Sequence, residues 1–315
     1  RAAERGVRVR RGLAFSDRGR IGELSFARCP APHRYVLSVP QRVTEATLRA
    51  ALLRRDPDAL VTGAEVHDLS SDRHGVRVSA RVDGRERTFE APHAVACDGR
   101  RSPCRRALGI AFDGGAYPGS YVMGDAPDDT GLGARAGIFL GREGLVESFP
   151  LPGGIRRWVA RRGTTAGDGS AEELCRTVAA RTGHRVDPAR VEHAGTFVAE
   201  RREADRFVDG RVTLAGDAAH VLSPIGGQGL NVGWLGAWSL GAALVEALGG
   251  DRAALRRDAR RRRRIARAAT RRAELNMWLG RPGRGGRPLV RAALRRPFGH
   301  GLARLFTMRG LRVGL

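Results

Sequence analysis

The chain has 315 residues, of which 42% are hydrophobic and 28% charged, so it can bury the core of one large domain or two modest ones and is not a disordered chain. Its formal net charge is +23 and it contains no lysine, so all 56 basic residues are arginine. This bias is spread over the whole chain, and we therefore do not read it as a nucleic-acid-binding patch. The four cysteines form no C-x-x-C pair, which argues against a zinc site or a disulfide framework and favours a cytoplasmic location.

The first part of the sequence predicts a helix followed by a small antiparallel sheet. Residues 44 to 55, "TEATLRAALLRR", place apolar residues at helical spacing, with Thr44 as a candidate N-cap. Residues 75 to 82 alternate apolar and polar side chains, Asp83 and Gly84 are typical of a tight hairpin turn, and residues 85 to 91 return as a strand. Before the helix we expect only short extended pieces.

The middle of the chain is rich in strand patterns. The apolar run "HAVACDG" predicts a strand that ends at Asp98 and Gly99, and a section follows that extends to about residue 205. Within it we predict strands at residues 136 to 151 and 155 to 162 and a helix at residues 171 to 183. Because this section lies between two pieces of αβ character, we interpret it as an inserted second domain.

The last third predicts a return to the first domain and then a helical tail. The strand "RVTLAGDAAH" (211 to 220) is followed by a glycine-rich turn and the apolar segment 230 to 248, which carries polar residues and reads as a buried helix rather than a membrane span. From residue 251 the tail is helical and arginine-rich, which predicts a solvated face, with breaks at residues 280 to 287.

The stretch "VTLAGDAAHVLSPIGGQGLN" (212 to 231) carries the chemistry. An apolar strand, an acid at its carboxyl end, a glycine-rich turn and a helix form the arrangement that binds ligands at the edge of a parallel sheet. A helix that starts near Gly229 would direct the N–H groups of Gly229, Leu230 and Asn231 at negative charge. Asp217 is placed to accept hydrogen bonds from sugar-like hydroxyls. The alternatives are that the glycines mark only a tight turn and that Asp217 is a simple helix cap.

Three segments resemble one enzyme family. "GDAAHVLSPIGGQGLN" is similar to the second FAD-binding motif of the aromatic-ring hydroxylases, single-component flavoprotein monooxygenases built like p-hydroxybenzoate hydroxylase. "ACDGRRSPCRRALGI" resembles the DG motif of that family, and "SVPQRVTEATLRAAL" its segment that touches the flavin, here through Gln41 or Arg42. The resemblance covers nearly the whole chain and weakens in the middle section and the tail.

The resemblance implies an α/β fold. It consists of a three-layer FAD/NAD(P)-binding domain, an inserted, mainly antiparallel substrate domain and a helical C-terminal tail. We expect the first part of the FAD domain in residues 1 to 110, the substrate domain in 111 to 205, the second part in 206 to 250 and the tail in 251 to 315. Family members open with a strand, G-x-G-x-x-G and a helix. This sequence has no such fingerprint, and we interpret it as a family member that lacks its first βαβ unit, either as an artefact or as a real loss.

The implied reaction is hydroxylation of a small aromatic or polycyclic molecule with O2 and NAD(P)H, with FAD as cofactor, as in secondary metabolism. The implied binding residues for the cofactors are Gln41, Arg42, Asp98, Gly99, Arg105, Asp217, Pro224, Gly226, Gly229, Leu230 and Asn231. We assign no catalytic side chain, and we read His220 as a structural hydrogen-bonding residue. For Arg105 a structural role and a pyrophosphate contact stay equally open.

Other functions stay open. The same fold serves other FAD oxidoreductases such as prenyl reductases and halogenases, although the tryptophan motif of the halogenases is not apparent. A chain without the glycine fingerprint is also compatible with an inactive remnant. In a different class, the arginine-rich tail is compatible with a nucleic-acid or membrane-surface binder, although we expect no nucleic-acid partner and little membrane contact. The sequence does not indicate an oligomeric state.

Overall fold

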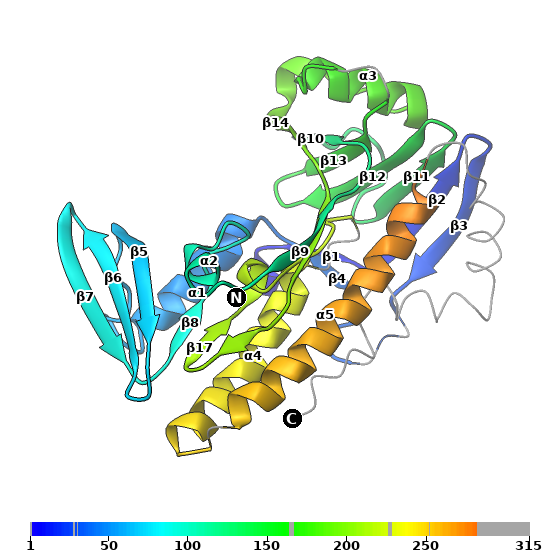
Figure 1. Ribbon diagram of the computed structural model, residues 1–315. Helices are drawn as coiled ribbons and strands as arrows, with labels where there is room; N and C mark the ends of the chain where they lie inside the picture. The colour runs from blue at the N-terminus through cyan, green and yellow to red at the C-terminus, as the bar shows by residue number, and fades with distance from the viewer. Residues whose placement is uncertain are drawn as a thin grey trace. The chain divides into compact units, whose positions relative to one another are not determined.

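The computed structural model describes residues 2–27, 29, 31–163, 167–225, 229–251 and 253–281. The described chain forms two compact units (Figure 1). Of the described residues, unit 1 contains those up to 57, 118 to 199 and 275 to 281, and unit 2 contains 58 to 117 and 200 to 274. The division into four domains that the sequence suggested stays a prediction.

A seven-stranded sheet forms the body of unit 1. Its strand order is β14-β10-β13-β12-β11-β2-β3, and its neighbouring strands are antiparallel except for the parallel pair β11 and β2. The strands are β2 (Arg11–Ser16), β3 (Gly19–Ser25), β10 (Tyr121–Pro127), β11 (Ala136–Gly141), β12 (Gly144–Leu151), β13 (Ile155–Arg161) and β14 (Glu192–Phe197). The predicted strands of the middle section are confirmed, and residues 11 to 25 join them in the same sheet.

Helix α3 (Ala171–Thr182) covers one face of this sheet (Figure 1). The helix begins after Ser170, whose hydroxyl accepts a hydrogen bond from the Glu173 N–H, and it ends at Gly183 in the left-handed conformation. The Leu174 and Val178 side chains of the helix are fully buried against the sheet. They pack on every second residue of the strands, because side chains along a strand point alternately to its two faces. The core residues on the covered face are Leu13, Val122, Phe139, Val146, Trp158 and Ala160.

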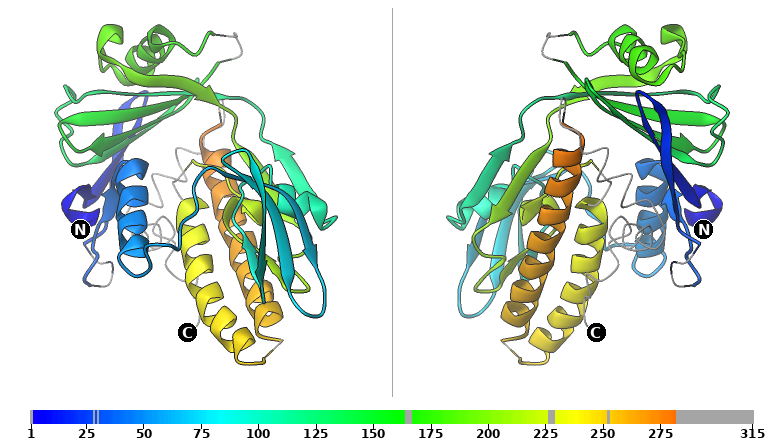
Figure 2. Two further views of the ribbon diagram at one scale, coloured as in Figure 1. Left: turned by 90° about the vertical axis from the view of Figure 1, so that its left-hand side faces the viewer. Right: turned by 90° about the vertical axis from the view of Figure 1, so that its right-hand side faces the viewer.

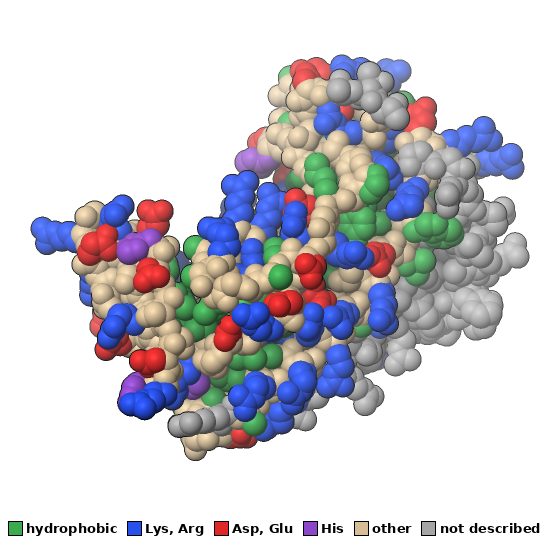
Figure 3. Space-filling model, viewed as in Figure 1, with side chains coloured by type: hydrophobic (Ala, Val, Ile, Leu, Met, Phe, Trp, Pro, Cys, Tyr) green, Lys and Arg blue, Asp and Glu red, His purple; other side chains and the backbone are tan. Residues whose placement is uncertain are grey.

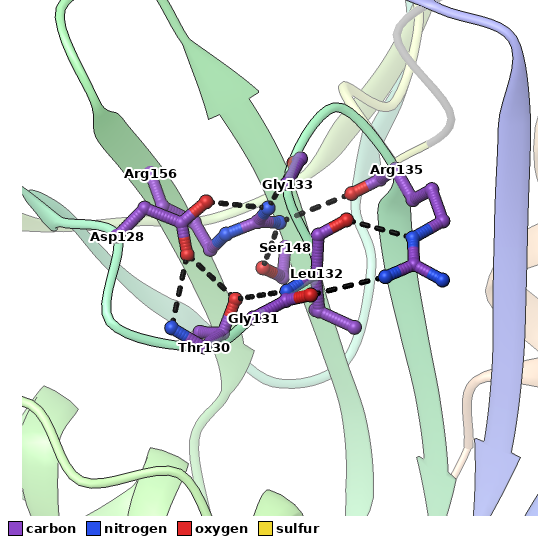
Figure 4. A network of polar contacts seen from close by, with 8 residues as sticks. All are labelled: Asp128, Thr130, Gly131, Leu132, Gly133, Arg135, Ser148 and Arg156. Carbon is purple, nitrogen blue, oxygen red and sulfur yellow. Dashed lines mark hydrogen bonds and ion pairs between the residues drawn. The ribbon is translucent and has the colours of Figure 1, made fainter.

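A buried guanidinium ties the loop after β10 to the sheet (Figure 4). Arg156 is fully buried, and its Nη2 donates to Asp128 Oδ2 at 2.8 Å and to the Gly133 carbonyl at 2.7 Å. Its Nη1 donates to Ser148 Oγ at 2.9 Å and to the Arg135 carbonyl at 3.2 Å. Desolvation alone would raise the pKa of Asp128, but hydrogen bonds from Arg156 and Thr130 outweigh it, so the net pKa is lowered.

Replacing Arg156 should therefore cost more than replacing a surface arginine. We expect Arg156→Met to lower the free energy of unfolding by about 3–5 kcal/mol, because Asp128 and two carbonyl groups lose their donor. In the parent, the part of the stability that comes from Asp128 is present above its unfolded pKa and is lost as the pH falls through its lowered folded pKa. The variant should lack this part of the acid dependence.

Urea unfolding as a function of pH measures both effects. Arg142→Met is the matched control, because the Arg142 side chain is exposed and its guanidinium approaches Asp17 only at 3.9 Å. A loss for Arg156→Met as small as that of the control would show that the buried network does not stabilise unit 1.

The remaining elements of unit 1 are short. Strands β1 (Val7–Val9) and β4 (Val36–Ser38) pair with each other, and η1 (Ala2–Glu4) and η2 (Pro188–Arg190) are single 3-10 turns. Helix α1 spans Gln41–Leu53 and begins directly after Pro40. The prediction of a helix here is confirmed, but the prediction that Thr44 caps it is wrong, because the proline-fixed backbone starts the helix three residues earlier.

Unit 2 contains three small sheets. The predicted antiparallel meander is confirmed as β5 (Ala64–Ser71), β6 (Val76–Val82) and β7 (Arg85–Ala91), with Asp83 and Gly84 in the turn at positive φ. A second sheet has the order β18-β15-β9, and a third has the order β16-β17-β8. Their strands are β8 (Ala94–Ala96), β9 (Phe112–Ala116), β15 (Glu200–Ala204), β16 (Val208–Asp209), β17 (Val212–Leu214) and β18 (His220–Val221). The short elements α2 (Pro103–Ala107) and η3 (Gly216–Ala218) follow β8 and β17.

Two long helices complete unit 2. Helices α4 (Gly229–Leu248) and α5 (Ala254–Leu279) lie side by side in both views of Figure 2, and the last residues of α5 belong to unit 1. Leu240 and Ala243 of α4 pack against Ala254 and Leu255 of α5. No helix in the described part of the chain is long and apolar enough to cross a bilayer.

The outer faces of these helices differ from each other. Basic side chains follow α5 (Figure 3), so the predicted solvated face is confirmed for most of its arginines. The prediction that the segment 230 to 248 is a buried helix holds for one face only. Its opposite face exposes large apolar side chains, Trp238 and Val245 among them at 68% and 72%. Sequence reasoning missed this because the segment is apolar on all sides.

Candidate cofactor-binding site

The site in unit 2 is built where two parallel strands end. Strands β8 and β17 pair in register, with Leu214 opposite Ala96, and the Ala215 N–H donates to the Ala96 carbonyl at 3.0 Å. The chain leaves β8 through Asp98 and Gly99 and leaves β17 through Gly216 and Asp217. Gly99 and Gly216 have φ of +78° and +58°, a conformation that side chains with a Cβ rarely adopt. The pairing therefore brings the predicted DG and GD motifs to one edge of the sheet.

Asp98 contributes to the start of helix α2. Its Oδ2 accepts a hydrogen bond from the Cys104 N–H at 3.0 Å, while the Ser102 hydroxyl accepts one from the Arg105 N–H at 2.9 Å. Desolvation alone would raise the pKa of Asp98, but hydrogen bonds from Ser102 and Cys104 outweigh it and lower the pKa. Asp98 is therefore ionised at neutral pH and already accepts a hydrogen bond within its own motif.

Arg105 links the two motifs from inside. It is 5% exposed, donates from Nη1 to the Ala218 carbonyl at 3.0 Å and from Nη2 to the Arg100 carbonyl at 2.8 Å, and lies 3.7 Å from the ring centre of Phe112. These contacts give Arg105 a structural role, because they hold the turn after β8 to the turn after β17. Its assignment as a pyrophosphate contact stays a prediction.

Asp217 is the acid that the protein leaves available. It lies in η3, is exposed, and makes no hydrogen bond or ion pair with any residue in the described ranges. Desolvation by the surrounding turn raises the pKa of its carboxyl, and Arg100 opposes this shift. Because the group is not used as a helix cap, the geometry favours the interpretation that it faces a ligand.

Helix α4 begins beside this acid. Its described part begins at Gly229, directly after residues 226 to 228, which lie outside the described residues, so the predicted helix start stays a prediction. One turn further, a Cβ on Gly233 would lie 3.8 Å from the Gly216 Cα, so the helix approaches the turn after β17 closely. Leu230 and Asn231 are exposed in the first turn. The first N–H groups of a helix have no acceptor within it, so this end stabilises negative charge.

The other predicted binding residues lie elsewhere or outside the description. Pro224 is an exposed turn residue after β18, and Gly226 lies outside the described residues. Gln41 and Arg42 are exposed in the first turn of α1, which belongs to unit 1, and Gln41 Nε2 donates to Glu45 Oε1 at 2.8 Å. Their contact with a flavin stays a prediction.

His220 is buried next to this site and is neutral. Burial, helped by Arg262, lowers its pKa to about 4. Its ring lies 5.9 Å from that of Phe207, and Nδ1 has no hydrogen-bond partner among the described residues. The interpretation of His220 as a structural hydrogen-bonding residue stays a prediction.

Sequence reasoning missed a buried polar network behind the strand ends. Arg262 of α5 is 3% exposed, donates from Nη1 to the Leu214 carbonyl at 2.8 Å, and pairs through Nε with Asp258 Oδ2 at 2.6 Å. Ser239 of α4 donates to Asp258 Oδ1 at 2.6 Å. The network joins α4, α5 and the last residue of β17. The available signal was an aspartate four residues before an arginine, which the surrounding arginine run obscured.

This network should be strongly coupled. We expect Asp258→Asn and Arg262→Met each to lower the free energy of unfolding by about 3–5 kcal/mol, because each leaves its partner buried and unsatisfied. The double variant should lose less than the sum of the two, with a coupling of about 1–3 kcal/mol.

A double-mutant cycle by urea unfolding measures this coupling. The exposed Arg264→Met serves as the control on the same helix and should change stability by less than about 1 kcal/mol. Strict additivity of the two buried changes would mean that Asp258 and Arg262 do not act as a pair.

The comparisons with known proteins agree with this geometry. The model of the FAD-binding-domain family matches residues 2–273, and the chain therefore belongs to that family. A crystal structure of p-nitrophenol 4-monooxygenase from Pseudomonas putida DLL-E4 superposes with a TM-score of 0.85 at 23% identity, covering 99% of this chain and 84% of that one. This likeness confirms the predicted α/β fold.

Two curated relatives are more similar in sequence. A 3-(3-hydroxy-phenyl)propionate/3-hydroxycinnamic acid hydroxylase of Burkholderia cenocepacia (strain HI2424) is 35% identical over 197 residues, which are 61% of this chain and 36% of that protein. A 12-dehydrotetracycline 5-monooxygenase/anhydrotetracycline 6-monooxygenase of Streptomyces rimosus is 34% identical over 242 residues, covering 70% of this chain and 48% of that protein. The chain thus spans less than half the length of either relative.

The residues of unit 2 fit part of an FAD molecule. Asp217 offers a carboxylate without a protein partner in the described ranges, which suits a hydroxyl-bearing chain. The start of α4 offers backbone N–H groups, which suit the negative charge of a reduced ring system. Gly99 and Gly216, at positive φ where the chain leaves β8 and β17, carry no side chain that would keep a ligand from the backbone.

Proposed function

We propose that this protein is an FAD-dependent monooxygenase that hydroxylates a small aromatic or polycyclic molecule with O2 and NAD(P)H. The observation that carries the proposal is the unpaired Asp217 carboxylate beside the amino end of α4, at the ends of two parallel strands. Family membership and the names of the two hydroxylating relatives support it. We also propose a cytoplasmic location, where NAD(P)H is available.

Bound FAD would supply the electron transfer and the oxygen chemistry. The protein's own residues would hold and polarise it. Asp217 would accept hydrogen bonds from hydroxyl groups of the cofactor, and the N–H groups of Gly229, Leu230 and Asn231 would stabilise negative charge on its ring system. The Arg262 network would keep the end of β17 in position, because it holds the Leu214 carbonyl from behind.

Asp217→Ala tests the proposed role of the carboxylate. We expect the dissociation constant of FAD to rise about tenfold or more, because a hydrogen bond to a charged group is lost without a change in the fold. The measurement is a titration of the purified chain with FAD, followed by the visible flavin absorption and by flavin fluorescence. Asp129→Ala is the control, since Asp129 is an exposed acid of unit 1.

The activity itself is tested by product analysis. Protein loaded with FAD should oxidise NAD(P)H faster when an aromatic substrate is added and should release a hydroxylated product in matching amount. A protein that binds no FAD at any concentration would contradict the proposed function. NAD(P)H oxidation that yields a reduced rather than a hydroxylated product would indicate another FAD oxidoreductase.

A further inference from the structure

Strand β12 carries a buried carboxyl group that the fold leaves unexplained. Glu147 is 6% exposed, and no residue within the described ranges donates a hydrogen bond to its carboxylate or pairs with it. A buried carboxyl group without a partner destabilises the folded chain, and most buried polar groups in proteins are satisfied. Groups of this kind gather at functional sites, which makes Glu147 a candidate contact for a ligand.

Glu147 points to the face of the sheet opposite α3. Its neighbours Val146 and Ser148 are buried on the covered face, and side chains alternate along a strand. The register places Ile138 of β11 and Val159 of β13 directly beside Glu147. Further along β10 and β14 the same face carries a methionine and a stacked aromatic pair, namely Met123, and Tyr121 with Phe197 at 5.2 Å between ring centres. This face therefore combines apolar and aromatic side chains with two carboxyl groups, of which Asp125 is paired with Arg157 and Glu147 has no partner among the described residues.

The charged groups around this face do not neutralise Glu147. Several elements pack against β12 from this side or share the face with it. Their titratable side chains are Arg8 on β1, Tyr121 and Asp125 on β10, Arg157 and Arg161 on β13, and Arg281 after α5. Arg157 is held by Asp125 through two hydrogen bonds of 2.7 and 2.8 Å. The Tyr121 hydroxyl contacts Met277 Sδ at 3.4 Å, and burial raises the pKa of Tyr121 to about 12. None of these groups forms an ion pair with Glu147 in the described structure.

We propose that Glu147 binds the substrate, with its carboxylate accepting a hydrogen bond from a hydroxyl group of an aromatic ring that lies on this face. The inference rests on the proposed function and narrows its substrate to hydroxylated aromatic molecules. Ligand sites of this kind are mostly apolar, with a few polar groups that fix the orientation. A hydroxyl donor would satisfy the Glu147 carboxylate, and an analogue without the donor would leave it unpaired.

The proposal has a pH signature. Burial raises the pKa of Glu147 to about 7, so the group gains its charge near neutral pH. A carboxylate accepts the hydrogen bond of a phenol better than a neutral carboxyl group does. The affinity for a phenol should therefore rise as the pH increases through about 7.

Two probes of nearly equal shape test the proposal. The full chain is titrated by calorimetry with 2-naphthol, which carries a hydroxyl donor, and with 2-methoxynaphthalene, which does not. We expect 2-naphthol to bind about tenfold more tightly above the pKa of Glu147, with a smaller preference below it. Glu147→Leu should abolish the preference, and Glu147→Asp should retain part of it. Glu143→Gln is the matched control, because Glu143 is exposed in the turn that precedes β12.

Unfolding provides an independent readout. A carboxyl group whose folded pKa lies above its unfolded pKa makes the protein lose stability as the pH rises from the unfolded to the folded value. Glu147→Gln should therefore move the urea midpoint upward above about pH 7 and leave it nearly unchanged in mild acid. A merely structural role would move this midpoint without affecting the preference between the two probes.

Several results would overturn the proposal. They are equal affinities for the two probes, a preference that survives in Glu147→Leu, an affinity for 2-naphthol that falls as the pH rises, and a failure of both probes to bind. FAD binding is measured separately by the visible absorption of the flavin. A protein that binds FAD but shows none of the expected probe behaviour would refute the role of Glu147 and leave the proposed function standing.

Discussion

The parallel pairing of β8 with β17 is the constraint on which the site in unit 2 depends. It brings two separate motifs, more than a hundred residues apart in the sequence, to one edge of a sheet. Short strands cannot hold such a pairing by their backbone hydrogen bonds alone. Here Arg105 donates hydrogen bonds to both turns that follow these strands, and Arg262 of α5 donates one to the Leu214 carbonyl. Asp217 therefore does not have to hold the turns together, and its carboxylate, which has no partner in the described ranges, can accept hydrogen bonds from a ligand.

The two units use polar groups in opposite ways. In unit 2 the buried charges are paired, as Arg262 and Asp258 are, and the exposed acid is available. In unit 1 Arg156 likewise donates to carbonyl groups and to Asp128, whereas no residue in the described ranges donates a hydrogen bond to the buried Glu147 carboxylate. A buried carboxyl group that accepts no hydrogen bond from a described residue is informative, since a leucine at this position would avoid the desolvation cost.

Local patterns in the sequence predicted most of the fold. The alternation in residues 75 to 91 predicted the meander, and the apolar segment 230 to 248 predicted the long helix α4. Long-range pairing could not be predicted, because nothing in residues 11 to 25 indicates that they join β11. Within the site, the positions of Asp98 and Asp217 followed from the motifs. The buried state of Arg262 did not, because among so many arginines a buried one has the same local sequence as a solvated one.

The absence of lysine has a further effect on how the interior is held together. Arg105, Arg156 and Arg262 each reach at least one main-chain oxygen, and Arg105 and Arg156 each reach two, from a planar group whose several donors point in fixed directions. An ammonium group has a single nitrogen and could not span those acceptors at once. Lysine substitutions would thus keep the charge at all three positions and still release neighbouring loops, so the exclusive use of arginine in this chain contributes to how those loops are held.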